Sequence, residues 1–275
     1  MNSRVPIALT IAGSDSSGGA GIQADLKTFS AFGVYGASVL TALTAQNTRG
    51  VHGVHLIPPA FVVAQMDAVL SDLDVATIKT GMLATSDIVE AVTRRLEACP
   101  SIPLIVDPVM VATSGDSLLD PAAINAVRQR LIPRALVVTP NLPEAAQLLN
   151  CAPATSEQEM INQAIALLAL RCSAVLLKGG HGEGLEALDI LVQADGTVTR
   201  FVRPRVATSS THGTGCTLSA AIAALLAGGA RLEDAVGRAK TYVWYALQAG
   251  DQLGVGSGHG PVDHLYAIRR QSPPA

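Results

Sequence analysis

The sequence has few aromatic residues, few charged residues and no apolar run long enough to cross a membrane. Aromatic side chains make up only 3% and charged side chains 15% of its 275 residues, whereas 49% are hydrophobic. The core must therefore be built from Ala, Val, Leu and Ile, which favours one large α/β domain. The net charge is −3 without a long Lys/Arg cluster. This balance argues against a nucleic-acid or anionic-membrane partner.

Closely spaced cysteines of the kind that bind zinc are also missing. Cys99, Cys151, Cys172 and Cys216 are far apart and form no CxxC motif, so neither a zinc site nor a disulfide framework is indicated. The first apolar stretch, 6–12, is only one strand long and is followed by no small-residue cleavage site. We therefore expect reduced thiols in a soluble cytoplasmic protein.

Two familiar nucleotide-binding motifs are incomplete or absent. The segment 19–24 matches GxGxxA, but the region about twenty positions later, 39–46, has no acidic residue to hold a ribose. No lysine follows a glycine anywhere in the chain, so the GxxxxGK[ST] loop is absent as well. Any phosphate site must therefore use a different helix start.

Short apolar runs alternate with helical patterns along most of the chain, which is typical of parallel strands joined by crossover helices. We expect strands at 7–11, 37–45, 76–79, 104–106, 135–138 and 174–177, and a β-hairpin at 188–193 and 197–202. Helices are expected at 21–32, 60–71, 88–96, 121–130, 158–170, 214–227 and 232–248. The strands are continuously apolar, which indicates burial on both faces. The prediction is one α/β domain, 1–275, with a core at about 7–264, a mostly parallel central sheet covered by helices on both faces, and a flexible tail at 271–275.

The most distinctive segment is THGTGCTLS at 211–219, where a glycine-spaced turn directly precedes a helix of small residues. Gly213 and Gly215 permit left-handed dihedral angles and a close approach to a ligand. The unpaired N–H groups of a helix start suit an anion such as phosphate. Cys216 at that start should have a lowered pKa and is a candidate base, while His212 could tune the thiol or make a structural hydrogen bond. The alternative is a glycine turn that caps a core helix beside an inert buried cysteine.

Polar residues follow most of the expected strands, where open α/β sheets bind their ligands. They include Asp25 after the glycine-rich loop 13–21, and then Gln46, Lys79, Met82, Asp107, Asn141, Glu144 and Lys178. Each also has a structural interpretation. Asp25 could support a helix dipole, Gln46 could anchor a loop, Met82 could fill the core, and Asn141 with Glu144 could form a capping box. The case for a site depends on their coincidence at one sheet edge.

Transfer of a terminal phosphoryl group is the chemistry that would use these residues together. Its transition state needs N–H donors, a cation and a divalent metal more than covalent chemistry. Gly213, Thr214 and Gly215 can supply donors and Lys178 the cation. Oxygen ligands for Mg²⁺, direct or through water, are expected from Asp107, Asn141 and Glu144. We expect the nucleotide beside Asn141, Lys178, Gly213 and Thr214.

Several motifs in one order resemble a known family. They are AGSDSSGGAGIQADLKTF, TALTAQNT, KTGML, VDPVM, TPNLPEA, LLKGGH, THGTGCTLSAAIAA and GHGPVDH, spanning about 7–264. This combination is similar to hydroxymethylpyrimidine/phosphomethylpyrimidine kinases, thiamine-pathway members of the ribokinase superfamily. The resemblance implies a ribokinase-like three-layer sandwich and an ATP- and Mg²⁺-dependent enzyme. It also implies phosphorylation of the hydroxymethylpyrimidine and then of its monophosphate, and a homodimer.

The resemblance also implies roles for individual residues. Gln46 would bond the aminopyrimidine and Asp25 the hydroxymethyl group or nearby polar atoms, while the pocket would be shaped by Gly13, Thr44, Met82 and Val109. Where the superfamily usually carries Asp, this chain carries Cys216, as these kinases and some similar pyridoxal kinases do. That difference implies a flat heteroaromatic alcohol rather than a sugar.

Three other functions remain open at this stage. A pyridoxal kinase of the same superfamily is the first alternative, since physical reasoning from the residues does not separate the two heterocycles. A phosphate-ligand or nucleotide sensor that has lost catalysis is a more distant one. A dinucleotide oxidoreductase depends only on the incomplete GxGxxA match.

Overall fold

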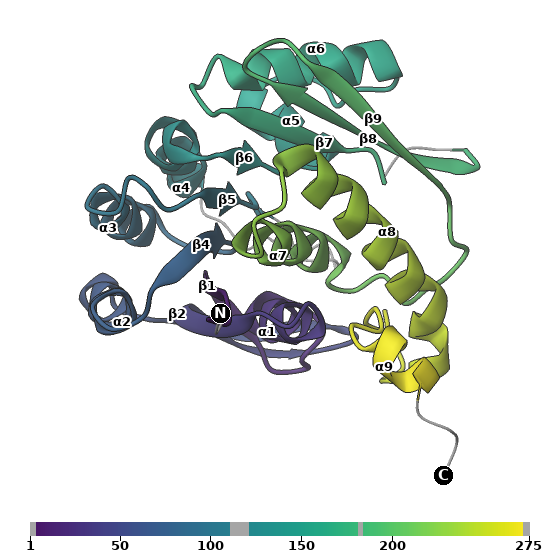
Figure 1. The fold of residues 1–275 in the computed structure, drawn as a ribbon, viewed down its shortest axis with the longest axis horizontal. Coiled ribbons are helices and arrows are strands. Elements are labelled where there is room, and N and C mark those ends of the chain that lie inside the picture. The colour runs from purple at the N-terminus through teal and green to yellow at the C-terminus, as the bar shows by residue number, and fades with distance from the viewer. Residues whose placement is uncertain (1–3, 111–120, 181–183, 272–275) are drawn as a thin grey trace.

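The structure is a computed structural model that describes residues 4–110, 121–180 and 184–271. One nine-stranded sheet runs through it in the order β3-β2-β1-β4-β5-β6-β7-β8-β9 (Figure 1). The strands are β1 (Ile7–Asp15), β2 (Tyr35–Asn47), β3 (Gly50–Leu56), β4 (Val75–Thr80), β5 (Leu104–Val106), β6 (Val137–Val138), β7 (Ala174–Lys178), β8 (Glu186–Gln193) and β9 (Val198–Pro204). Neighbours from β2 to β7 pair in parallel, whereas β3, β8 and β9 pair antiparallel. The mostly parallel sheet is therefore confirmed.

Helices cover both faces of this sheet. They are α1 (Gly21–Ala31), α2 (Pro59–Leu70), α3 (Ser86–Leu96), α4 (Pro121–Ala126), α5 (Leu142–Leu149), α6 (Glu157–Leu168), α7 (Thr214–Ala227), α8 (Leu232–Gly250) and α9 (Tyr266–Gln271). The apolar residues of α2 to α6 pack in one cluster with one side of the strands, and those of α1, α7 and α8 pack in another with the opposite side. Helices α2, α3 and α4 accordingly lie away from α1 and α7 across the strands in Figure 1.

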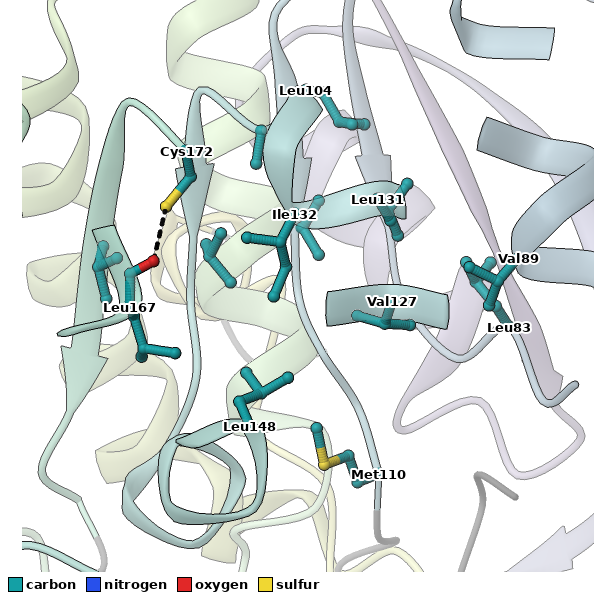
Figure 2. Packing of buried hydrophobic residues seen from close by; sticks show 14 of the residues in the cluster. Leu83, Val89, Leu104, Met110, Val127, Leu131, Ile132, Leu148, Leu167 and Cys172 are labelled. Carbon is teal, nitrogen blue, oxygen red and sulfur yellow. Dashed lines mark hydrogen bonds between the residues drawn. The ribbon is translucent and has the colours of Figure 1, made fainter. Parts of the chain in front are cut away.

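Neighbouring residues of one strand belong to different clusters. The strand is therefore buried on both faces, as continuous apolar strands predict. Leu9 and Ile11 of β1 belong to the larger cluster, whereas Ala8, directly before Leu9, belongs to the other. Figure 2 shows part of the larger cluster, where Leu104 of β5 packs near Leu131 and Ile132. Branched aliphatic side chains of Val, Leu and Ile form most of it, as the low aromatic content requires.

Most of the expected elements are present, with differences at their ends. The hairpin is formed by β8 and β9, and β2 runs beyond the expected 37–45 to Asn47. The helix expected at 121–130 ends as α4 at Ala126 and continues as a π-helical turn over Val127–Leu131. Strand β3 was not expected, because most of its side chains are exposed and it contains no buried apolar run. Gln271 ends α9, and the rest of the expected tail, 272–275, lies outside the described residues.

Candidate active site

The carboxyl ends of the parallel strands lie at one edge of the sheet and surround a cavity of about 630 Å³. Almost all candidate residues from the sequence line this cavity. They are Gly13, Thr44, Gln46, Met82, Asp107, Val109, Asn141, Glu144, Lys178, Gly213, Thr214, Gly215 and Cys216. The sheet therefore brings together strand ends that are up to 165 residues apart in sequence, between Gly13 and Lys178. His181 of the expected KGGH motif lies outside the described residues.

The start of α7 is packed directly against the loop that leads into α1. Gly213 is the N-cap of α7 and has a φ of +79°, a left-handed conformation that favours glycine. A Cβ atom at this position would lie 1.9 Å from the carbonyl oxygen of Gly19. The backbone N–H of Gly21, the first residue of α1, acts on the thiol of Cys216, one turn further on, and lowers its pKa. Two helix starts therefore meet at the thiol.

The pKa of Cys216 differs in direction from the sequence-based expectation. Burial raises the pKa of this thiol to about 11, although Lys79 acts to lower it. The expectation of a lowered pKa was wrong because the loss of hydration outweighs the favourable helix starts and the nearby cation. The thiol is therefore protonated near neutral pH.

Lys178 carries its positive charge to the start of α7. Its Nζ lies 3.1 Å from Oδ1 of Asp107, and a Cβ atom on Gly215 would lie only 3.3 Å from that Nζ. Burial lowers the pKa of Lys178, but Asp107 and Glu144 outweigh that effect and raise it, so the ammonium stays charged. The site thus combines a fixed cation with helix N–H groups, which together suit an anion.

Two buried carboxylates face this cation. Asp107 accepts hydrogen bonds from Thr139 and Ser219 as well as from Lys178. Burial would raise the pKa of Asp107, but Lys178 and Lys79 outweigh it and hold that pKa below its ordinary value. Burial raises the pKa of Glu144 to about 7, against the opposing effect of Lys178.

Asn141 and Glu144 form the capping box that the sequence allowed. The Glu144 N–H donates to Asn141 Oδ1 at 2.8 Å, and the Asn141 N–H donates to Glu144 Oε2 at 2.8 Å. This structural role coexists with exposure to the cavity, since both residues line it. Within the described ranges, no group of three or more His, Cys, Asp or Glu side chains is arranged to hold a metal ion.

Asp25 is the one candidate that the fold does not bring to the cavity wall. Its carboxylate accepts from Lys79 Nζ at 2.8 and 2.9 Å and from Thr10 Oγ1 at 2.6 Å, and the side chains of Asp25 and Lys79 are both fully buried. Lys79 lines the cavity, whereas Asp25 does not. The geometry therefore does not support the expected contact of Asp25 with a substrate and instead makes it the counterion of Lys79.

At the β2 end, the cavity is lined by apolar side chains and one amide. Met82 and Val109 supply apolar surface, and Gln46 supplies hydrogen-bonding groups. Gly13 lets Met82 approach, since a Cβ atom there would lie 2.4 Å from Met82 Cε. Thr44 contacts the Gln46 side chain with its hydroxyl. A flat ring with polar edges matches this end of the cavity.

Sequence reasoning missed a buried contact between Asp15 and His212. His212 Nε2 lies 2.8 Å from Asp15 Oδ2, and the same carboxylate accepts the N–H groups of Ser17, Gly19 and Ala20. The contact joins the glycine-rich loop after β1 to the residue directly before Gly213. His212 therefore has the structural hydrogen bond that was one of its two expected roles. The acidic residue within the glycine-rich motif was the signal that could have indicated it.

Another missed contact is an ion pair in the part of the cavity formed by β8 and α8. Lys240 Nζ donates to Asp189 Oδ2 at 2.6 Å, and Asp189 Oδ1 accepts the N–H of Gly179 at 3.0 Å. Both charged residues are buried and line the cavity. The pair holds the chain directly after Lys178, so it fixes where β7 ends. The aspartate within the apolar run 188–192 was the available signal.

Comparison with known proteins gives the same family along nearly the whole chain. The sequence profile of the Phosphomethylpyrimidine kinase family matches residues 15–263. A protein of Escherichia coli (strain K12), a hydroxymethylpyrimidine/phosphomethylpyrimidine kinase, is 55% identical over 260 residues, which cover 94% of this chain and 97% of the relative. These matches show a phosphotransferase.

Solved structures agree with this fold. A phosphomethylpyrimidine kinase from Clostridium difficile 630 has a TM-score of 0.78 and 41% identity, covering 88% of this chain and 99% of its own. A pyridoxal kinase from Staphylococcus aureus, in complex with AMP-PCP and pyridoxal, has a TM-score of 0.89 and 35% identity, covering 97% and 96%. The expected ribokinase-like architecture is confirmed, and the chain belongs to the phosphomethylpyrimidine kinase family.

Proposed function

We propose that this chain transfers the terminal phosphoryl group of ATP to 4-amino-5-hydroxymethyl-2-methylpyrimidine and then to the resulting monophosphate, in thiamine biosynthesis. Family membership and the 55% identical relative support the substrate. One structural observation supports the chemistry most directly. An end with Gln46, Met82 and Val109 and an end with Lys178 and the α7 start share one cavity, and Cys216 also lines it.

The residues that line the cavity have separate roles in this reaction. Gln46, Met82 and Val109 hold the ring, so that its hydroxymethyl group points towards Cys216. The N–H groups at the start of α7 and the Lys178 ammonium stabilise the negative charge that spreads over the transferred phosphoryl oxygens. The Cys216 thiol first loses its own proton to solvent, which the nearby Lys79 ammonium favours, and the thiolate then accepts the hydroxyl proton.

Magnesium fits the donor set at the phosphate end, although the described side chains do not form a closed cage. Asp107 and Glu144 both line the cavity, and the oxygens of Asp107 already accept from Lys178, Thr139 and Ser219. Mg²⁺ commonly binds through one or two carboxylates while keeping waters and substrate phosphate oxygens. Asp107, Glu144 and Asn141 would hold the ion in that way, and it would neutralise charge on the phosphates.

We also propose a cytoplasmic homodimer with one kinase domain in each chain. Strand β3 at one end of the sheet exposes Val54 and Leu56 on one face, a surface that a second copy would cover. No helix within the described ranges is long and apolar enough to cross a membrane. Analytical ultracentrifugation at several concentrations tests the dimer, and a mass that stays that of one chain would contradict it.

The test of the function is release of ADP with each pyrimidine, with pyridoxal as the competing substrate. Pyridoxal kinase activity is the rival because solved pyridoxal kinases share the fold at 35% identity. We expect turnover of both the alcohol and its monophosphate, and kcat/KM higher for the pyrimidine alcohol than for pyridoxal. A tenfold preference for pyridoxal would overturn the assignment. Tight nucleotide binding without turnover of any alcohol would instead indicate a non-catalytic sensor.

A further inference from the structure

Gln46 is held at its backbone and at its side chain by two different hydroxyl groups. The Ser16 hydroxyl donates to the Gln46 carbonyl oxygen at 2.8 Å and accepts the Gln46 N–H at 2.9 Å. A hydroxyl group can donate one hydrogen bond and accept another at the same time, because it has one proton and two lone pairs. The backbone of Gln46 is therefore fixed where β2 ends, and its side chain reaches the cavity from a defined position.

The hydroxyl of Thr44 contacts two groups, and it cannot donate fully to both. Its Oγ1 lies 2.8 Å from the carbonyl oxygen of Ser14 and 3.1 Å from Oε1 of Gln46. Both oxygens can only accept, but the Gln46 amide can turn its nitrogen towards Thr44 whereas the backbone carbonyl of Ser14 cannot change, so the single Thr44 proton goes to Ser14. Leaving Oε1 opposite the Thr44 oxygen would then place two lone-pair-bearing atoms together, without a proton between them.

Both distances indicate how this conflict is resolved. A separation of 2.8 Å is typical of O–H···O bonds, whereas 3.1 Å is long for them and ordinary for N–H···O bonds. A half turn of the Gln46 amide exchanges Oε1 and Nε2 and places the NH₂ group against the Thr44 oxygen. The Thr44 hydroxyl then donates once and accepts once, as the Ser16 hydroxyl does.

We propose that Thr44 determines ligand specificity by orienting the Gln46 amide, so that Nε2 donates to Thr44 Oγ1 and Oε1 accepts a hydrogen bond from the bound ligand. The part of the chain that the structure describes contains no further partner for the far end of this amide, and Gln46 lines the cavity. A ligand must therefore present a donor at that point. This inference rests on the proposed function and deepens it.

The exocyclic amino group of an aminopyrimidine is such a donor. A ring that carries an acceptor oxygen in place of the amino group would face Oε1 with lone pairs. It could bind only after the amide turns back and gives up its bond to Thr44. A buried polar group that loses its partner costs about 1–3 kcal/mol, or about 5- to 150-fold in affinity. Thr44, which does not itself have to touch the ligand, thus decides which heterocycles Gln46 accepts.

Binding of two ligands to three forms of the protein tests the proposal. The ligands are the 4-amino substrate and its 4-methoxy analogue, in which an acceptor oxygen replaces the donor. The proteins are wild type, Thr44→Val, which removes the hydroxyl at nearly constant shape, and Thr44→Ser, which keeps it. Dissociation constants are measured by calorimetry without ATP, and thermal melting checks that each variant is folded.

We expect wild type and Thr44→Ser to prefer the amino compound, and the ratio of the two dissociation constants to fall at least fivefold in Thr44→Val, mainly because the methoxy compound binds better. If Thr44 only shapes the pocket, both ligands change in parallel, and an unchanged ratio would overturn the proposal. A wild-type preference for the methoxy compound would also overturn it. Because no turnover is measured, a protein that binds with the expected ratio but releases no ADP would contradict only the proposed function.

Discussion

Replacing Gly213 with alanine should destabilise the protein by more than the cost of its left-handed backbone angle alone. An alanine in the left-handed region costs about 1–2 kcal/mol. At Gly213 the new Cβ would also lie 1.9 Å from the carbonyl oxygen of Gly19, so the chain before α7 or the glycine-rich loop must move. Such overpacking adds about 1–3 kcal/mol. Gly213→Ala should therefore lower the free energy of unfolding by about 2–5 kcal/mol.

Gly229, just after the opposite end of α7, provides a matched control. Its φ of +85° is nearly that of Gly213, but no heavy atom lies within 4 Å of an added Cβ. Gly229→Ala should thus lower the free energy of unfolding only by the cost of the left-handed backbone conformation, about 1–2 kcal/mol. Urea unfolding followed by circular dichroism measures both. If the two variants lose equal stability, the predicted close contact with Gly19 is not present in solution.

The same pair of variants separates catalysis from stability. A displacement of about 1 Å between reacting groups can cost about 10²-fold in rate, so kcat of Gly213→Ala should fall by that order under conditions where the protein stays folded. Gly229→Ala should retain kcat. Rates of ADP release at saturating substrate measure this, and a wild-type kcat in Gly213→Ala would refute the assignment of this turn to phosphoryl transfer.

Three further predictions concern single side chains. Because Cys216 must lose a proton whose pKa is about 11, kcat/KM should rise with pH from 7 to 9 in wild type. Cys216→Ala should lose about 10²-fold in kcat and lose this pH dependence, and identical pH profiles would exclude the thiol as base. Lys79→Met should destabilise by about 3–5 kcal/mol, since it leaves the Asp25 carboxylate buried without its cation. Burial raises the pKa of Asp25, so this loss should be smaller at pH 5 than at pH 8 in urea unfolding; an equal loss would contradict it. Gln46→Ala should weaken substrate binding by about 1–3 kcal/mol, and an unchanged KM would remove Gln46 from the pocket.

The parallel sheet and most of its helices could be predicted because burial on both faces leaves continuous apolar runs in the sequence. Strand β3 leaves no such run, since most of its residues are exposed and only its pairing with β2 keeps it extended. The capping box at Asn141 was also predictable, because its two members are three residues apart. Local patterns thus reveal structure that is stabilised locally or by uniform burial.

Contacts between distant segments were not predictable in this way. His212 meets Asp15 across 197 positions, and Lys79 meets Asp25 across 54. The pKa of Cys216 depends on how deeply the fold buries it, whereas the sequence showed only that it begins a helix. The contact of Asp25 with Lys79 was unforeseen for the same reason, since nothing near Asp25 in sequence reveals that Lys79 binds its carboxylate.

The most direct test of the central claim is to follow the products from the pyrimidine alcohol by phosphorus NMR, in the presence of ATP and Mg²⁺. We expect the monophosphate to appear first and then to be converted to the diphosphate, with one ADP released in each step. Cys216→Ala should slow both steps, because both use the same start of α7. Accumulation of the monophosphate without any diphosphate, or ADP release without a phosphorylated pyrimidine, would contradict it.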